Sequence, residues 1–276
     1  SQRTPVKRSC GGSACNTIVA ASRFGAATFF SGKVADDDEG IFFVKDLNRA
    51  GVDFHQVDAS SGITGKCLVM ISPDAERTMN TYLGASLELS YREVDEEALA
   101  ASDWLYIEGY VVTDDERTAV AREAMIYAKK NGIKTSLSLS DPFVVEVFSD
   151  NIKTIIGDDG VDLIFCNGDE ARSFTGTHTV EAAAEALKKY AKTFAITRGA
   201  GGSLVFDGAN LVHTPGVLAS AVDTNGAGDM FAGSFLYALG LGKDFSWAAD
   251  FANAASSRVV SQFGPRIKVI EYISLK

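Results

Sequence analysis

A carboxylate follows a glycine-rich turn in the stretch AVDTNGAGDMFAGSFLYAL, residues 221–239. Gly226 and Gly228 let the backbone approach a ligand closely and take φ values that a Cβ would forbid. Asp229 comes next, and a nearly unbroken apolar run then predicts a buried helix. The first amides of a helix lack internal partners and lie at the positive end of its dipole. The turn therefore predicts an anion site.

Asp229 is at a position where backbone amides attract phosphate. A carboxylate there repels the phosphate and costs free energy, so we expect it to have a chemical role. The role that fits is accepting a proton from an alcohol that attacks the phosphate. We expect the amides of Gly226, Ala227 and Gly228 to hold the charge of the transferring group. The alternative is a plain glycine turn before a core helix, with Asp229 as a charge partner of the helix end.

The composition is that of a globular protein with a large core. The chain has 276 residues, of which 46% are hydrophobic and 22% are charged. Its formal net charge of −10 argues against a surface for nucleic acid or anionic membrane. No signal peptide and no membrane-spanning apolar run can be recognised, so we expect a cytoplasmic protein.

The cysteines Cys10, Cys15, Cys67 and Cys166 show neither CxxC nor Cys/His zinc spacing. The three histidines are widely scattered, which argues against a His-based metal site. We expect all four cysteines to be buried or half-buried free thiols.

Strands and helices alternate over most of the chain, which predicts a parallel sheet with helices on both faces and ligands at the carboxyl ends of its strands. The region before residue 94 differs, because its later strands have no helix between them and two of them fit a hairpin. The predicted strands are 26–30, 52–57, 65–72, 77–83, 104–108, 134–139, 162–166, 193–197, 203–206 and 211–214. The predicted helices are 10–24, 39–50, 96–101, 114–131, 144–151, 153–156, 169–175, 180–190, 229–239 and 245–262.

The string DTNGAGD resembles the C-terminal signature of the ribokinase (PfkB) family of sugar and nucleoside kinases. GGSACN, followed by GKVADDDEG, resembles the N-terminal signature of the same family, and the resemblance covers about residues 9–265. It implies a ribokinase-like three-layer α/β/α sandwich with a mostly parallel sheet, one kinase domain over 1–276, and a small β-sheet lid partly formed by about 52–83. Family members begin with a strand that carries a substrate-binding aspartate. We expect that strand to be missing here, because only ten residues precede Gly11.

The resemblance implies that Gly11, Gly12 and Asn16 contact the sugar part of the substrate. Arg77, in RTMNTYLGA, looks like an arginine of the adenosine-kinase-like branch. The alternatives are a plain loop-to-helix turn for the glycines, a helix-surface amide for Asn16 and a solvated strand charge for Arg77.

Two further motifs resemble the nucleotide side of the family. NGDE matches the NxxE motif, which implies that Asn167 lies at the nucleotide and that Glu170 holds magnesium through water. Without the resemblance, the same two residues predict a helix capping box. TRGAGG looks like the TxGxxG nucleotide loop, which implies that Thr197, Gly199 and Gly202 bind the nucleotide.

Near the C-terminus, Asn253 and Gly264 resemble family positions around the adenine of ATP. The alternatives are that Asn253 lies on a helix surface and that Gly264 ends a helix. Asp223 and Asn225 precede the glycine turn, in a loop that binds potassium in many members of the family. The alternative for Asp223 is a side chain that caps its own turn.

The resemblance implies ATP-dependent phosphoryl transfer to a primary hydroxyl of a purine nucleoside, with ATP and magnesium as cofactors and potassium left open. Phe54, Val69 and Met70 are apolar residues of the expected lid that could pack on a base. The alternatives are a sugar kinase for ribose or fructose-type substrates, and a catalytically silent nucleotide-binding regulator. We expect small-molecule partners, no nucleic acid or membrane partner, and a monomer or homodimer.

Overall fold

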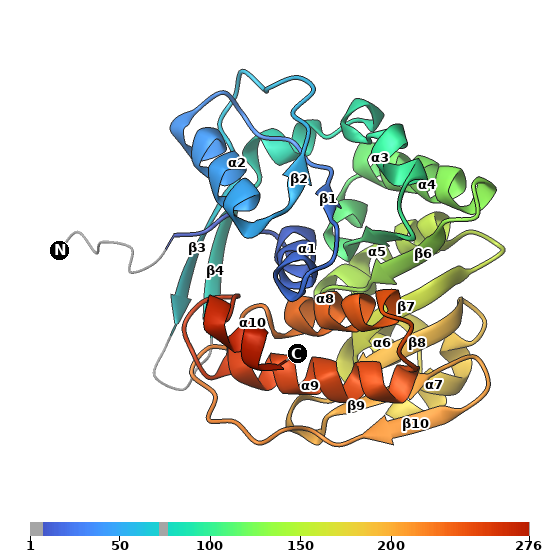
Figure 1. The fold of residues 1–276 in the computed structure, drawn as a ribbon. Helices are drawn as coiled ribbons and strands as arrows, with labels where there is room; N and C mark the ends of the chain where they lie inside the picture. The colour runs from blue at the N-terminus through green and yellow to red at the C-terminus, as the bar shows by residue number, and fades with distance from the viewer. Residues whose placement is uncertain (1–7, 72–76, 276) are drawn as a thin grey trace.

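The structure is a computed structural model that describes residues 8–71 and 77–275. Within these residues, helices cover both faces of a six-stranded sheet (Figure 1). The helices are α1 (Ser13–Phe24), α2 (Asp38–Ala50), α3 (Glu96–Ala100), α4 (Asp115–Lys130), α5 (Pro142–Ile156), α6 (Gly168–Thr175), α7 (Val180–Leu187), α8 (Ala227–Gly240), α9 (Phe245–Val260) and α10 (Val269–Leu275). The strands are β1 (Phe29–Phe30), β2 (Asp53–Phe54), β3 (Lys66–Ile71), β4 (Arg77–Tyr82), β5 (Trp104–Ile107), β6 (Lys134–Ser138), β7 (Val161–Asn167), β8 (Ala191–Thr197), β9 (Ser203–Phe206) and β10 (Leu211–Thr214).

The sheet has the strand order β10-β9-β8-β7-β6-β5. Strands β5 to β8 run parallel, while β9 and β10 are added as an antiparallel hairpin. Strand β7 reads VDLIFCN and is buried on both faces, as expected for a central parallel strand. This arrangement confirms the predicted three-layer α/β/α class and its mostly parallel sheet.

Two hydrophobic cores lie on opposite faces of the sheet. Side chains of α4, α5, α6 and α7 form one core with the sheet, and α8, α9, α10 and α1 form the other. Helix α1 can pack closely on α8 because position 233 is a glycine: a Cβ there would lie 2.2 Å from the main-chain oxygen of Thr17. Figure 1 shows α1 lying beside α8, between the sheet and the N-terminal region.

The N-terminal region lies outside the main sheet. Strands β1 and β2 form a separate parallel pair of two residues each, which is shorter than the strands predicted at 26–30 and 52–57. Strands β3 and β4 form an antiparallel ribbon whose register pairs Lys66 with Tyr82. We call this ribbon the lid, and it confirms the strands predicted on either side of residues 73–76.

The structure differs from the local predictions at three points. Helix α10 was not predicted, and it is held because Tyr272 is buried and its ring packs edge-on against Phe24 at a centroid distance of 4.8 Å. The two helical segments predicted within 144–156 are present in α5, but the non-helical residue that separates them is Phe148 rather than Ile152. Cys67 is exposed, whereas the other three cysteines are buried as expected.

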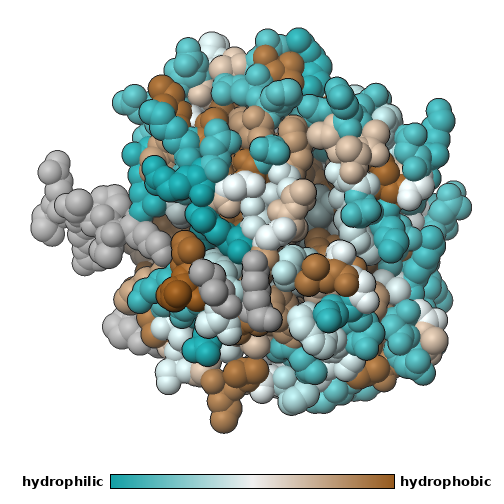
Figure 2. Space-filling view, viewed as in Figure 1, coloured by the Kyte–Doolittle hydropathy of each residue, from teal (hydrophilic) through white to brown (hydrophobic). Residues whose placement is uncertain are grey.

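The visible surface in Figure 2 is mainly hydrophilic, with small scattered groups of apolar side chains. Across the described ranges, none of the helices has both the length and the apolar character needed to cross a bilayer.

Candidate active site

Asp229 lies in the first turn of α8 and is held by two side chains from α1. Ser13 Oγ donates to Asp229 Oδ1 at 2.8 Å, and Asn16 Nδ2 donates to Oδ2 at 2.9 Å. Asn16 is only 7% exposed, so it is not the helix-surface amide considered as an alternative. The structure thus joins the two signature motifs, which are more than 200 residues apart, through a single carboxylate.

The turn before Asp229 has the shape that the glycines predicted. Gly226 is the N-cap of α8 with φ of 77°, and a Cβ there would lie 2.5 Å from Pro265 Cβ. A Cβ on Gly228 would meet no atom within 4 Å, so the space beside this amide is open. The Ala227 amide donates to the Thr224 carbonyl at 3.3 Å and is partly used by the turn itself.

A second helix N-terminus meets the first at this point. Gly12 is the N-cap of α1 with φ of 102°. A Cβ added at Gly11 or Gly12 would meet no atom within 4 Å. Since α1 and α8 both direct their N-terminal ends here, two positive dipole ends converge beside Asp229. That convergence favours an anionic ligand.

Glu108 is a site residue that sequence reasoning missed. It directly follows β5, and its Oε2 accepts the Ala14 amide at the start of α1 at 2.5 Å. Burial raises the pKa of Glu108, and the nearby negative charge of Asp229 raises it further. The signal was available, because a glutamate at the carboxyl end of a parallel strand occupies the position where such sheets bind ligands.

Tyr110 connects this centre to the next strand ends. Burial raises the pKa of its phenol, and the charges of Asp141, Asp229, Glu108 and Glu170 all raise it further. Tyr110 therefore lies in a region of negative charge. Beside them at the end of β6, Ser140 has φ of 69°, an unusual backbone conformation for a residue other than glycine.

Asn167 and Glu170 form the capping box that their spacing predicts. The Asn167 side chain accepts the amides of Asp169 and Glu170, while Glu170 accepts the Asn167 amide at 2.9 Å and its Nδ2 at 2.6 Å. Burial, reinforced by the charge of Asp141, raises the pKa of Glu170 to about 7. The capping role is compatible with a ligand role, because a carboxylate has about four acceptor positions.

The loop after β8 adjoins this capping box, since Thr197 pairs with Asn167 in the sheet register. Gly199 and Gly202 have φ of 55° and 84°. A Cβ on Gly202 would lie 2.1 Å from the main-chain oxygen of Thr214. A glycine is therefore also needed at this position to avoid a steric clash.

Asn253 is buried rather than on the helix surface. Its Nδ2 donates to Ser203 Oγ and Thr214 Oγ1, each at 3.1 Å, and to the Pro215 carbonyl at 3.2 Å. The amide nitrogen is therefore committed to holding the end of β10 against α9.

Asp223 has no exposed surface and caps its own turn, as the alternative reading proposed. Its Oδ1 accepts the Asn225 amide at 2.9 Å, and its Oδ2 accepts the Gly264 amide at 2.7 Å. These bonds fix the turn of residues 223–229 against the segment that carries Pro265.

In the lid, Val69 is half-buried and Met70 is exposed. Neighbouring residues of a strand point to opposite faces, so the expectation that both pack on one substrate base is wrong. The backbone of Arg77 begins β4, but its side chain lies outside the described part of the structure.

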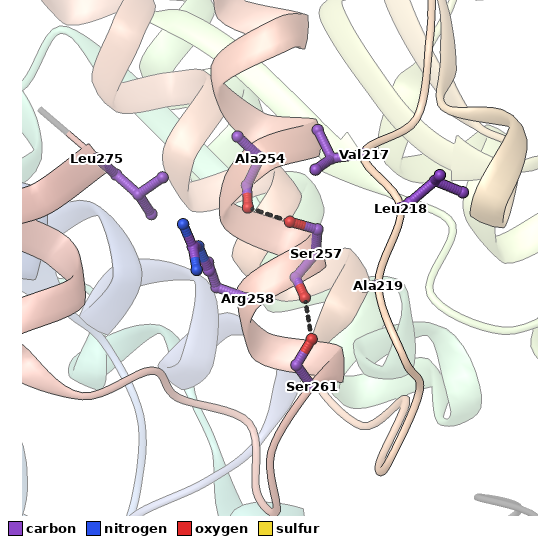
Figure 3. A pocket seen from close by; sticks show the side chains of 8 residues that line it. All are labelled: Val217, Leu218, Ala219, Ala254, Ser257, Arg258, Ser261 and Leu275. Atoms are coloured by element: carbon purple, nitrogen blue, oxygen red, sulfur yellow. Dashed lines mark hydrogen bonds between the residues drawn. The ribbon is translucent and has the colours of Figure 1, made fainter.

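A hollow of about 230 Å³ lies beside α9 and the loop that leads to residues 223–229. Figure 3 shows Val217 and Leu218 on one side of α9 and Leu275 on the other, with Arg258 between them. The hollow does not include Asp229. In the portion of the chain that is described, no three His, Cys, Asp or Glu side chains are grouped as a metal site.

The sequence profile of the pfkB family carbohydrate kinases matches residues 2–271. The chain belongs to this family. Its members transfer phosphoryl groups from ATP, so this protein is an ATP-dependent kinase, and the family also implies a divalent metal.

Relatives of this kinase act on more than one kind of substrate. It is 30% identical to a ribokinase from Haemophilus influenzae over 94% of this chain and 83% of the relative. It is 29% identical to adenosine kinase 1 from Arabidopsis thaliana over 96% of this chain and 82% of the relative. Among solved structures, adenosine kinase from Sinorhizobium meliloti superposes with a TM-score of 0.92 at 33% identity, covering 98% of this chain and 84% of that one.

Proposed function

We propose that this kinase transfers the γ-phosphoryl group of ATP to a primary hydroxyl of a purine nucleoside. The observation that carries the proposal is the position of Asp229, fixed by Ser13 and Asn16 where the N-terminal ends of α1 and α8 converge. A carboxylate held in this way accepts the proton of the attacking hydroxyl, while the surrounding amides favour phosphate.

Each part of the chain has a distinct task in this proposal. Ser13 and Asn16 orient the Asp229 carboxylate, and Gly11 and Gly12 leave room for the sugar. The open space beside Gly228 receives the transferring phosphoryl group, whose charge the backbone amides of the turn stabilise. Phosphoryl transfer needs little covalent help, so orientation and electrostatics supply most of the rate enhancement.

Glu170 is better suited to hold magnesium through an intervening water than to ligate the ion directly. Both of its oxygens already accept bonds from Asn167, and its raised pKa reflects a buried carboxyl group near other carboxylates. A bound magnesium ion would neutralise phosphate charge and favour the ionised form of this side chain. The charge of Asp141, at the neighbouring strand end, raises the pKa of Glu170, and that of the adjacent Asp169 raises it further.

The nucleotide base has a fitting place beside α9. We place the adenine of ATP along the hollow between Val217–Leu218 and the side of α9 that carries Ala254 and Ser257 (Figure 3). Asn253 supports this wall from behind, through its bonds to Thr214 and Pro215.

A nucleoside acceptor is supported by the fold similarity to an adenosine kinase and by the half-buried apolar face of the lid, which includes Val69. The 30% identity to a ribokinase favours the competing sugar acceptor. The two acceptors differ in whether a base must pack under the lid.

An acceptor panel tests the proposal. ATP consumption would be measured with adenosine, inosine, guanosine, ribose and fructose, using Asp229→Asn as the matched blank. A purine nucleoside should give the highest kcat/KM. A sugar as best acceptor would replace the nucleoside assignment, and no turnover with any acceptor would support a silent nucleotide-binding regulator.

A further inference from the structure

Cys10, in the loop that precedes α1, lies beside Cys15 in the first turn of α1. Their Sγ atoms are 3.6 Å apart, and the Cys15 thiol donates to the Cys10 sulfur. Both are free thiols and are 2% and 1% exposed. A disulfide bond is about 2.05 Å long, so closure needs the two sulfurs to approach by only about 1.5 Å.

Arg266 makes the two thiols chemically different. Its Nη2 lies 2.8 Å from Cys10 Sγ and donates to the Cys10 carbonyl at 2.5 Å, while Nη1 pairs with Asp46 Oδ2 at 2.9 Å. The hydrogen bond from Cys15 and the charge of Arg266 lower the pKa of Cys10, although burial and Asp46 oppose them. The hydrogen bond to Cys10 and burial raise the pKa of Cys15. Cys10 is therefore the more acidic thiol of the pair and the one that ionises first.

The residues between the two cysteines belong to the active site. Ser13 bonds Asp229, and the Ala14 amide bonds Glu108. On the other side, Arg266 directly follows Pro265, which packs against Gly226 in the turn at α8. A change at this cysteine pair thus reaches both helix N-termini that form the phosphate site.

We propose that Cys10 and Cys15 form an oxidation-sensitive pair that closes to a disulfide and slows phosphoryl transfer reversibly. The oxidant is a hydroperoxide. Cys10 thiolate attacks its outer oxygen and breaks the O–O bond, giving a sulfenic acid and, with hydrogen peroxide, hydroxide. The Cys15 sulfur then attacks the Cys10 sulfur and forms the S–S bond, while the sulfenic oxygen leaves as water with the Cys15 proton.

The sulfurs lose two electrons in total, and the peroxide gains them. Closure would tie Gly11–Ala14 into a small ring and convert the thiol that faces Arg266 into an uncharged disulfide sulfur. A displacement of about 1 Å in a catalytic group can cost on the order of 10²-fold in rate, so we expect turnover to fall roughly 10–100-fold.

The test uses the full chain with Cys67→Ser, because Cys67 is the exposed thiol. After treatment with hydrogen peroxide, peptide mass mapping should find the peptide of residues 9–23, which carries both Cys10 and Cys15, lighter by two hydrogen atoms. ATP turnover with the best acceptor should fall as this internal disulfide accumulates, and both the mass and the turnover should recover with dithiothreitol.

Cys10→Ala and Cys15→Ala, each in the Cys67→Ser background, are the matched controls. Each variant is compared with its own untreated sample, so a change in basal rate does not matter. Neither variant can form the internal disulfide, and Cys10→Ala should keep its turnover under peroxide. The proposal is overturned if the disulfide between Cys10 and Cys15 does not form, if it forms without loss of turnover, or if Cys10→Ala is inactivated as strongly as the parent.

Discussion

The phosphate side of the site, formed by residues 223–229 with Ser13 and Asn16, is built from helix ends that pack on the core. The lid is an antiparallel ribbon outside the main sheet. Asp223 has no exposed surface, and Asp229 is bonded by two side chains of a packed helix. In the lid, by contrast, Leu68 is 56% exposed.

Under the proposed function, this contrast assigns a different task to each region. Stabilising charge at a transferring phosphoryl group requires donors that are already in place, which suits the packed turn of residues 223–229. Recognition of the acceptor would add apolar contacts that the ligand itself completes, and we propose that the half-exposed ribbon supplies them. Substitutions on the phosphate side should therefore lower kcat, and substitutions in the lid should change KM.

The largest effect is expected for Asp229→Asn. An amide cannot accept the hydroxyl proton as a carboxylate does, so kcat should fall by roughly 10²–10⁴-fold. Nucleotide binding, followed by calorimetry, should persist. Near-normal turnover in a folded Asp229→Asn protein would show that Asp229 is not the catalytic base.

Glu170 should give the next largest effect, through pH. Its pKa in the folded protein is about 7, against an ordinary value of 4.5, so the folded state binds this proton more tightly than the unfolded state does. The stability contributed by the protonated side chain is present at low pH and is lost as the pH rises through about 7.

Urea unfolding without magnesium, followed from about pH 5 to about pH 8, should show a loss of up to about 3 kcal/mol that Glu170→Gln lacks. If the stability of the two proteins changes with pH in the same way, the pKa of Glu170 is not raised in the folded protein.

A smaller effect is expected for the monovalent cation. We propose that potassium near Asp223 and Asn225 stiffens the turn, in addition to the bonds that Asp223 already makes to its neighbours. Turnover should change several-fold between potassium and a bulky organic cation at fixed ionic strength, and Asp223→Ala should abolish that difference. Equal rates in the two salts would leave only the capping role.

The lid should show the smallest change, and it offers an internal control. Val69→Ala removes apolar contact from the half-buried face and should raise the KM of the nucleoside about fivefold, equivalent to about 1 kcal/mol, with kcat unchanged. Met70→Ala lies on the opposite face and should leave KM unchanged. Equal effects of the two variants would contradict the assignment of faces.

Local features could be predicted from the order of the amino acids. The glycine turn before Asp229, the Asn167–Glu170 capping box and the alternation of strands and helices follow from backbone freedom and hydrogen-bond geometry within a few residues. Short elements were least predictable, as β1 and β2 show, because two residues carry almost no periodic signal.

Which of these features lie next to one another depends on how the helices and strands pack. The close crossing of α1 over Gly233 brings Ser13 and Asn16 to Asp229 and the Ala14 amide to Glu108. The packing also decides that the Asn253 amide holds Thr214 and Pro215, and that Arg266 reaches Cys10. Such contacts depend on how whole helices and strand ends pack, which a local window of sequence does not contain.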